Sequence, residues 1–391
     1  MTYTEEGRAM SIASCMTDVP HPGVFIAEEL EARDWLQRDL AYILGVPEQT
    51  VNMIVSGKRG ISPEMAKALG DAFDVAPAFF SNLQNAYEMS KARAPDPAVA
   101  RRALLQSIFP VREMIKRAWL EDTDVPLLEA QLMRFFRRND LTAITHMAHA
   151  SKKSGDYATD TPAQLAAQLA WLFRVRQICS EMITPAYSEA RLRQAIAEFP
   201  RYMVDPEEVR HVPRILNDCG VRFAIVETFP KAKIDGVCFW EDHQTPVVGM
   251  STRFDRIDNF WFVLRHELEH VLNKDGRGKS DEDVSVDTDL QSDNAHHLPP
   301  EEVRANAAAA DFCVPTEELN SFFLRKAPYI GEKDVLGFAR RIQRHPGIVV
   351  GQLQRLMERP EYLARLKVKV RQFVAQSAVV DGWGVPAPVQ L

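Results

Sequence analysis

The segment that most restricts how this chain can fold is a run of five residues, His266-Glu267-Leu268-Glu269-His270. It lies inside an apolar stretch, 260–272, that has helical periodicity. Residues four positions apart on an α-helix differ in direction by only about 40°, so His266 and His270 point the same way and can hold one metal ion. Glu267 lies about 100° to one side, close enough to reach a water molecule at the ion. Two surface histidines with nearby glutamates would give the same pattern, but the apolar flanks favour a metal centre.

A catalytic zinc ion usually takes three protein ligands and leaves one position open for water. The candidates for the third ligand are Glu301, Glu302, His296 and His297. Glu302 is favoured because it begins a predicted helix, and Asn306, one turn further on, is placed to hydrogen-bond a ligand histidine from the same face. The two candidate histidines lie in a polar, acidic segment and are interpreted as solvated.

The N-terminal part has the pattern of a helix-turn-helix, with predicted helices at 37–44 and 48–55 separated by Gly45. The second helix presents polar side chains that can contact base edges, namely Gln49, Thr50 and Asn52. Beyond it, Lys58 and Arg59 are placed to hold phosphates. A generic small helical domain without DNA binding is the alternative interpretation.

The hydrophobic period changes along the chain. Short helical patterns occupy 21–89 and 98–200, separated by a hinge-like segment at 91–97. After Pro206 the pattern is β-rich, and its turn residues indicate a small antiparallel sheet with strands at 221–226, 236–240 and 246–250. The predicted fold class is therefore mainly α with a small antiparallel sheet (α+β). An extended substrate could pair with an edge of that sheet, for example at 246–250.

The composition excludes several classes of protein. The net charge is −7, whereas a chain that works mainly by coating nucleic acid would be basic, so any DNA contact must be local. The five cysteines are scattered without a Cys-x-x-Cys pair, which argues against a Cys-rich zinc module and a disulfide framework. No apolar run approaches the ~18–20 residues needed to cross a bilayer, and the N-terminus lacks a secretory signal pattern. We therefore expect a cytoplasmic protein without membrane contact.

Longer motifs in the N-terminal part resemble a known family. His21-Pro22-Gly23, Leu44-Gly45-Val46 and Gly57-Lys58-Arg59-Gly60-Ile61-Ser62-Pro63 are similar to the Cro/repressor-like fold of HigA-type antitoxins. The resemblance covers nearly all of residues 21–89. We expect this helix-turn-helix to bind a DNA operator as a homodimer.

The metal segment resembles a second family. Residues 260–272, together with Glu302-x-x-Ala305-Asn306, are similar to the ImmA/IrrE metallopeptidase family. The resemblance implies that His266, His270 and Glu302 ligate zinc and that Glu267 is the general base. Relatives often have Gly where this chain has Glu269, which is interpreted either as a side chain that supports the ligands or as one that narrows the cleft.

Together the patterns and resemblances predict five parts: a disordered N-terminus (1–20), a helix-turn-helix domain (21–90), a helical linker domain (91–205), a zincin-like metallopeptidase domain (206–360), and a C-terminal helix with a disordered tail (361–391). The implied function is a DNA-binding regulator fused to a zinc-dependent endopeptidase that cleaves a repressor or antitoxin. Two alternatives stay open: an antitoxin-like transcription factor whose C-terminal domain binds metal or a partner without cutting, and a metabolite-sensing repressor with the helical middle as receptor. His345 is conceivable as the oxyanion stabiliser, but a histidine before Pro346 at a helix end is more typical of a structural role.

Overall fold

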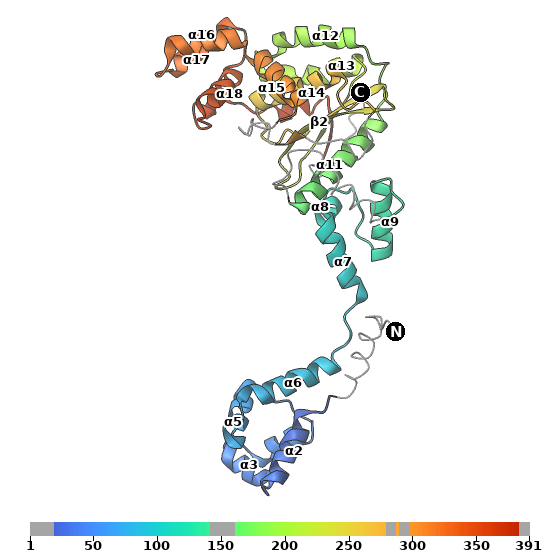
Figure 1. Cartoon of the computed structure of the whole chain (residues 1–391), viewed down its shortest axis with the longest axis vertical. Coiled ribbons are helices and arrows are strands. Elements are labelled where there is room, and N and C mark those ends of the chain that lie inside the picture. The colour runs from blue at the N-terminus through green and yellow to red at the C-terminus, as the bar shows by residue number, and fades with distance from the viewer. Residues whose placement is uncertain (1–18, 141–160, 279–286, 289–297, 383–391) are drawn as a thin grey trace, which may run out of the picture. The chain divides into compact units, whose positions relative to one another are not determined.

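The computed structural model describes residues 19–140, 161–278, 287–288 and 298–382. The chain divides into two compact units, Met1–Asp96 and Pro97–Leu391, whose elements are labelled in Figure 1. Almost all of the segment 1–20, expected to be disordered, lies outside the described residues. Among the helices of the described ranges, none combines the length and the apolar character that a membrane crossing requires.

The described part of the first unit is a bundle of helices: α2 (Pro22–Ala32), α3 (Gln37–Leu44), α4 (Glu48–Val55), α5 (Pro63–Phe73) and α6 (Pro77–Lys91). Helices α3 and α4 have the bounds that the sequence predicts. Gly45 ends α3 in the left-handed region, with φ of 66°. Ser62 caps α5 as its position before Pro63 predicts, because its Oγ accepts a hydrogen bond from the Met65 N–H at 3.2 Å. The helix-turn-helix arrangement of the sequence is thus present in the backbone.

A close approach between two helices shapes this bundle. A Cβ on Gly23 of α2 would lie 2.3 Å from the carbonyl oxygen of Ile54 near the end of α4, so the contact requires glycine. The apolar faces of α2, α4 and α5 meet in one core that includes Ile26, Ile54 and Phe73. This packing buries one side of α4 and leaves its polar side at the surface.

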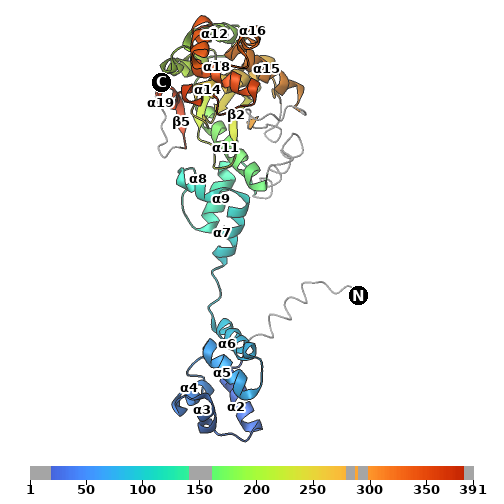
Figure 2. The same cartoon turned by 90° about the vertical axis from the view of Figure 1, so that its left-hand side faces the viewer.

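The second unit surrounds a small sheet with helices, as the turned view in Figure 2 shows. Its described helices are α7 (Pro97–Ile108), α8 (Val111–Lys116), α9 (Val125–Phe135), α11 (Pro162–Ser180), α12 (Glu189–Glu198), α13 (Val212–Asp218), α14 (Ile257–Asn273), α15 (Pro300–Cys313), α16 (Thr316–Lys326), α17 (Glu332–Arg341), α18 (Pro346–Met357) and α19 (Arg371–Val374), with short 3-10 turns at Phe199–Tyr202, Pro206–His211 and Ala364–Leu366. Of the linker domain expected at 91–205, residues 97–205 belong to the same compact unit as the sheet. The mainly helical fold with a small sheet is confirmed.

The sheet has the strand order β4-β2-β3-β1-β5. The strand bounds are Asp287–Thr288 (β4), Ile234–Glu241 (β2), Thr245–Met250 (β3), Arg222–Val226 (β1) and Val379–Asp381 (β5). β2 is antiparallel to β3 and β4, but β1 is parallel to β3 and β5, so the sheet is mixed rather than purely antiparallel. The tight turn between β2 and β3 fixes only that pair. The parallel pairs join segments that are not adjacent in the sequence, and local turn signals do not encode them.

Two further expectations about the sheet are corrected. The segment 246–250 was expected to offer a free edge, but β3 is a central strand that pairs with β2 on one side and β1 on the other. The segment Val379–Asp381, expected within a disordered tail, forms a strand beside β1. An ion pair between Arg174 of α11 and Asp381 helps to hold it there. Both features depend on contacts between distant segments.

The two faces of the sheet pack against different helices. Phe223 and Ile225 of β1 belong to a core that contains the apolar side of α14, whereas Ala224 and Val226 belong to a second core that contains α11. This division follows from the alternation of side chains along a strand. On β2 the same alternation places Gly236 on the α14 side, which positions the site described next.

Candidate functional site

Helix α14 carries the predicted metal-binding segment, and it is buried along most of its length. His266 and Glu267 have no exposed surface, and His270 is 5% exposed. The apolar residues 260–264 anchor the helix in the core between the sheet and α18. Lys274 ends the helix in the left-handed region, with φ of 58°. This burial excludes the interpretation of two solvated surface histidines.

The structure brings three potential ligand atoms together. His266 Nε2 lies 3.2 Å from Glu302 Oε2, and His270 Nε2 lies 3.5 Å from Glu302 Oε1. The two Nε2 atoms are 3.1 Å apart. Among the described residues, this triad is the group of His, Cys, Asp and Glu side chains whose ligand atoms converge as a metal ion requires. Sequence reasoning had assembled the same three residues.

The triad fits a tetrahedral divalent cation in chemistry and size. Ligand atoms about 2.0–2.1 Å from a tetrahedral zinc ion are roughly 3.3–3.4 Å from one another, close to the observed spacings. Two imidazoles and one carboxylate are a common donor set for catalytic zinc, with a fourth position left for water. The side chains present therefore suit zinc.

Glu302 is held in place by close packing of two helices. It lies in the first turn of α15, and Ala305 and Ala309 on the same helix are fully buried in the contact with α14. Burial by itself raises the pKa of Glu302, but its contacts with His266 and His270 outweigh burial and hold the pKa well below its ordinary value. The side chain is therefore a carboxylate at neutral pH, as a metal ligand must be.

The Glu267 carboxylate lies against the backbone of β2. A Cβ built on Gly236 would be 2.1 Å from Glu267 Oε1 and 2.9 Å from its Cδ, so this contact requires the absence of a side chain. Sequence reasoning missed Gly236. A glycine inside a predicted strand was the available signal, because it often marks a close approach of another group.

A second missed residue supports His270. Asp275, just beyond the end of α14, has its Oδ2 atom 3.0 Å from His270 Nδ1 and 2.6 Å from the Arg304 guanidinium. A carboxylate on the outer ring nitrogen orients a histidine ligand and makes it more basic. This was the role expected for Asn306, but in the described residues Asn306 Oδ1 is buried without a hydrogen-bond partner. An acidic residue shortly after the second histidine was the signal that could have indicated Asp275.

Glu269 forms its contacts along its own helix. Its carboxylate forms an ion pair with Arg265 at 2.7 Å and accepts a hydrogen bond from Asn273 at 2.8 Å. Burial raises the pKa of Glu269, but these two partners lower it more, so the pKa is below its ordinary value. Two roles were considered for Glu269: support of the ligand histidines and narrowing of the cleft. These contacts show neither role.

The remaining candidates at this site have other placements. Glu301 lies beside Glu302 in the first turn of α15 but outside the triad. His296 and His297 lie outside the described residues. His345 caps α18 by accepting a hydrogen bond from the Gly347 N–H at 3.0 Å, which agrees with the structural role. His21 caps α2 in the same way, so His-Pro-Gly acts as a helix start in both units.

In the first unit the predicted DNA-contacting residues lie on one side of α4 and just after it. Gln49 and Asn52 are exposed and Thr50 is half-buried, while Lys58 and Arg59 are exposed in the following turn. Asn52 donates a hydrogen bond to Gln37 of α3 at 3.2 Å. Asn52 therefore also ties the two helices of the motif together.

Two family models match the chain, one in each unit. The family model described as helix-turn-helix matches residues 26–80, and the model described as IrrE N-terminal-like domain matches residues 221–354. No solved structure matches the chain.

Two curated relatives are similar to a short part of the chain. The uncharacterized HTH-type transcriptional regulator YddM of Escherichia coli (strain K12) is 30% identical over 92 residues, which is 23% of this chain and 98% of the relative. Virulence-associated protein A' of Dichelobacter nodosus is 36% identical over 77 residues, which is 19% of this chain and 67% of the relative. The chain therefore belongs to the family of helix-turn-helix transcriptional regulators and joins to its DNA-binding domain an IrrE N-terminal-like, metallopeptidase-related domain.

Proposed function

We propose that the chain is a DNA-binding transcriptional regulator whose second unit is a zinc-dependent endopeptidase acting on a repressor or antitoxin protein. The observation that carries the proposal is the triangle of ligand atoms from His266, His270 and Glu302, with spacings of 3.1, 3.2 and 3.5 Å. The match to an IrrE N-terminal-like domain supports it. The buried Glu267, next to the first histidine, supplies the acid–base group that peptide hydrolysis needs.

The side chains divide the chemistry between them. When bound, a zinc ion supplies a Lewis acid that polarises a peptide carbonyl and lowers the pKa of water towards neutrality. Glu267 accepts the proton of the attacking water and returns it to the leaving nitrogen. Asp275 accepts a hydrogen bond from His270 Nδ1, which keeps His270 Nε2 directed towards His266, where the two histidines would hold the ion. The close contact with Gly236 fixes the Glu267 carboxylate against the sheet.

We propose that the substrate peptide binds along strand β2 rather than along β3, because β3 is a central strand. In the described part of the chain, β4 pairs with β2 at Ile234 and Gly236, which leaves the outer side of 237–241 without a strand there. An extended peptide can add to such an edge through backbone hydrogen bonds. That edge begins next to the residue that touches Glu267, so a peptide on it would pass close to the triad.

Co-expression of the full chain with candidate repressors tests the proposal. The wild type should bind about one zinc ion per chain and degrade one of the candidates. Glu267→Gln should keep the zinc and lose cleavage, because an amide cannot accept the proton. Glu301→Gln, a matched change outside the triad, should keep both properties. Cleavage by Glu267→Gln at the wild-type rate would remove Glu267 from the mechanism, and zinc binding without cleavage of any candidate by the wild type would favour a non-proteolytic regulator.

The first unit is proposed to bind an operator as a homodimer, with half-sites about one helical turn apart. The exposed side chains of Gln49 and Asn52 on α4 support base contacts, and Lys58 and Arg59 support phosphate contacts. Selection of binding sites with the full chain should enrich a motif with two-fold symmetry. Failure to enrich any motif would favour a protein-interaction role for these helices.

A further inference from the structure

The second unit contains a cavity of about 590 Å³ that is separate from the metal triad. It is bordered by helix α8, by the loop 227–233 between β1 and β2, and by the turn before α14, and none of the triad residues lines it. Its volume lies in the range of about 300–1,000 Å³ that is usual for small-molecule sites. None of the residues assigned above to metal binding, acid–base chemistry or DNA contact lines it.

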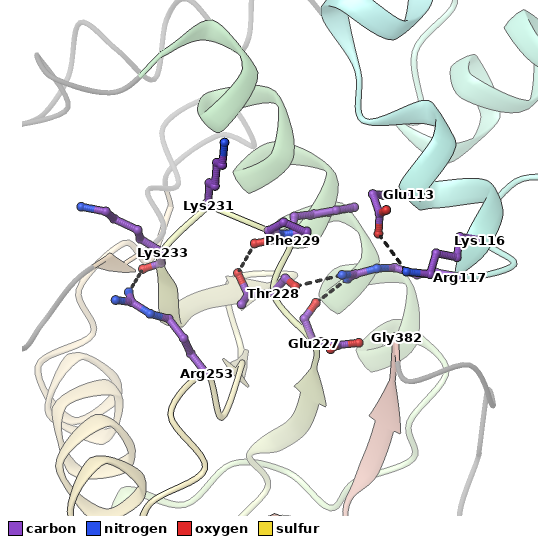
Figure 3. Close-up of a pocket in the computed structure, with 11 residues that line it drawn as sticks. Glu113, Lys116, Arg117, Glu227, Thr228, Phe229, Lys231, Lys233, Arg253 and Gly382 are labelled. Atoms are coloured by element: carbon purple, nitrogen blue, oxygen red, sulfur yellow. Dashed lines mark hydrogen bonds and ion pairs between the residues drawn. The ribbon is translucent and has the colours of Figure 1, made fainter.

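The lining of this cavity is strongly cationic. Five basic side chains border it, and two carboxylates, those of Glu113 and Glu227, accompany them. The basic residues are Lys116, Arg117, Lys231, Lys233 and Arg253. Figure 3 shows Arg117 reaching the loop from the end of α8, with Lys231, Lys233 and Arg253 on the other side of Phe229. Lys116 of α8 pairs instead with Glu113, at 3.9 Å. A concave surface with this excess of one sign concentrates ions of the opposite sign.

Arg117 lines the cavity and is held in place by its contacts with the loop. It is 8% exposed, its guanidinium donates to the carbonyl oxygens of Glu227 at 2.6 Å and Thr228 at 2.9 Å, and it stacks over the Phe229 ring at 4.3 Å. Burial lowers the pKa of Arg117, but a guanidinium stays charged at neutral pH. The hydrogen bonds of this guanidinium go to neutral carbonyl groups, so its positive charge adds to the field of the cavity, against the opposing charges of Glu113, Glu227 and Asp381.

The two loop lysines are held by an unusual backbone. Lys231 and Lys233 have φ of 67° and 55°, in the left-handed region that side chains other than glycine rarely adopt. Three side chains hold this loop by donating to consecutive carbonyl oxygens: Gln164 to Lys231 at 3.1 Å, Gln168 to Ala232 at 3.3 Å, and Arg253 to Lys233 at 2.8 Å. Backbone strain that the surroundings maintain in this way is characteristic of ligand-binding segments. The loop therefore keeps two cationic side chains at the rim of the cavity.

We propose that this cavity binds a small molecule with at least two anionic groups of the phosphate or carboxylate type. The volume sets the size of the ligand, and the excess of five cations over two carboxylates sets its charge. The loop, held by its hydrogen bonds, provides a site that is ordered before binding. The proposal is independent of peptidase activity, because it concerns a different set of side chains.

Calorimetric titration of the full chain at about 150 mM salt tests the proposal, with fructose 1,6-bisphosphate and succinate as probes of the two anion types. At least one probe should bind the wild type, and the stronger of the two identifies the anion type. Lys231→Gln/Lys233→Gln should weaken that binding by at least about tenfold, because two charge-assisted contacts are lost. Lys333→Gln/Arg340→Gln, which removes two charges from exposed positions of α17, should bind like the wild type.

Thermal unfolding of both double variants establishes that they are folded, and the glutamine side chain preserves a Cβ at the two strained positions. Absence of binding heat with both probes in the wild type would overturn the proposal. Equal loss of affinity in the two double variants would also overturn it, because the effect would then come from net charge rather than from the cavity.

Discussion

Replacement of Gly236 by alanine tests how closely strand β2 holds the Glu267 carboxylate. The new Cβ would lie 2.1 Å from Glu267 Oε1, whereas ordinary contact begins at 3.4 Å, so the oxygen must move by about 1.3 Å. Displacement of a reacting group by about 1 Å can lower a rate about a hundredfold. If the proposed peptidase activity is present, we expect kcat/KM for cleavage of the proposed repressor substrate to fall by about that factor. The overpacking should also lower the free energy of unfolding by about 1–3 kcal/mol.

Gly249→Ala on β3 is the matched control. A Cβ there would lie 2.7 Å from Val175 Cγ1 on the α11 side of the sheet, away from Glu267. Urea denaturation should show a similar loss of stability in both variants, and both should retain zinc. Cleavage, measured under conditions where both are folded, should be impaired in Gly236→Ala alone. Equal cleavage rates in the two variants would refute the idea that this contact positions a catalytic carboxylate.

Three further predictions concern the metal, the ion pair beside it and DNA. His270→Ala should reduce bound zinc from about one ion per chain to almost none in elemental analysis, and unchanged zinc content would contradict the ligand assignment. Glu269→Gln should lower the free energy of unfolding by about 1 kcal/mol at pH 7. Because the folded pKa of Glu269 is lowered, this loss should vanish as the pH falls below the unfolded value of 4.5 and through the folded pKa. Urea unfolding at several pH values measures it. Asn52→Ala should relax operator specificity by about 1–3 kcal/mol, whereas Lys58→Ala should weaken binding to all sequences and flatten its salt dependence. Identical salt slopes for Lys58→Ala and wild type would contradict the phosphate contact.

The features that the sequence predicted are those with local causes. The bounds of α3 and α4 follow from helical periodicity and from Gly45, and the start of α5 follows from Ser62 and Pro63. The convergence of His266 and His270 follows from their spacing on one helix. Glu302 was predictable from its position at the start of a helix together with the family resemblance. These residues required no knowledge of how distant segments pack.

The features that the sequence did not predict depend on contacts between distant segments. Gly236 reaches Glu267 only because β2 packs on α14, and β3 is a central strand only because β1 pairs with its outer side. The pairing of β5 with β1, the support of His270 by Asp275, and the cationic cavity arise in the same way. Periodicity and turn residues specify which segments become helices or strands, whereas the burial of both faces of the sheet decides which segments become neighbours. The residues proposed to bind the metal could therefore be predicted from the sequence, whereas the groups that surround them are determined by tertiary packing.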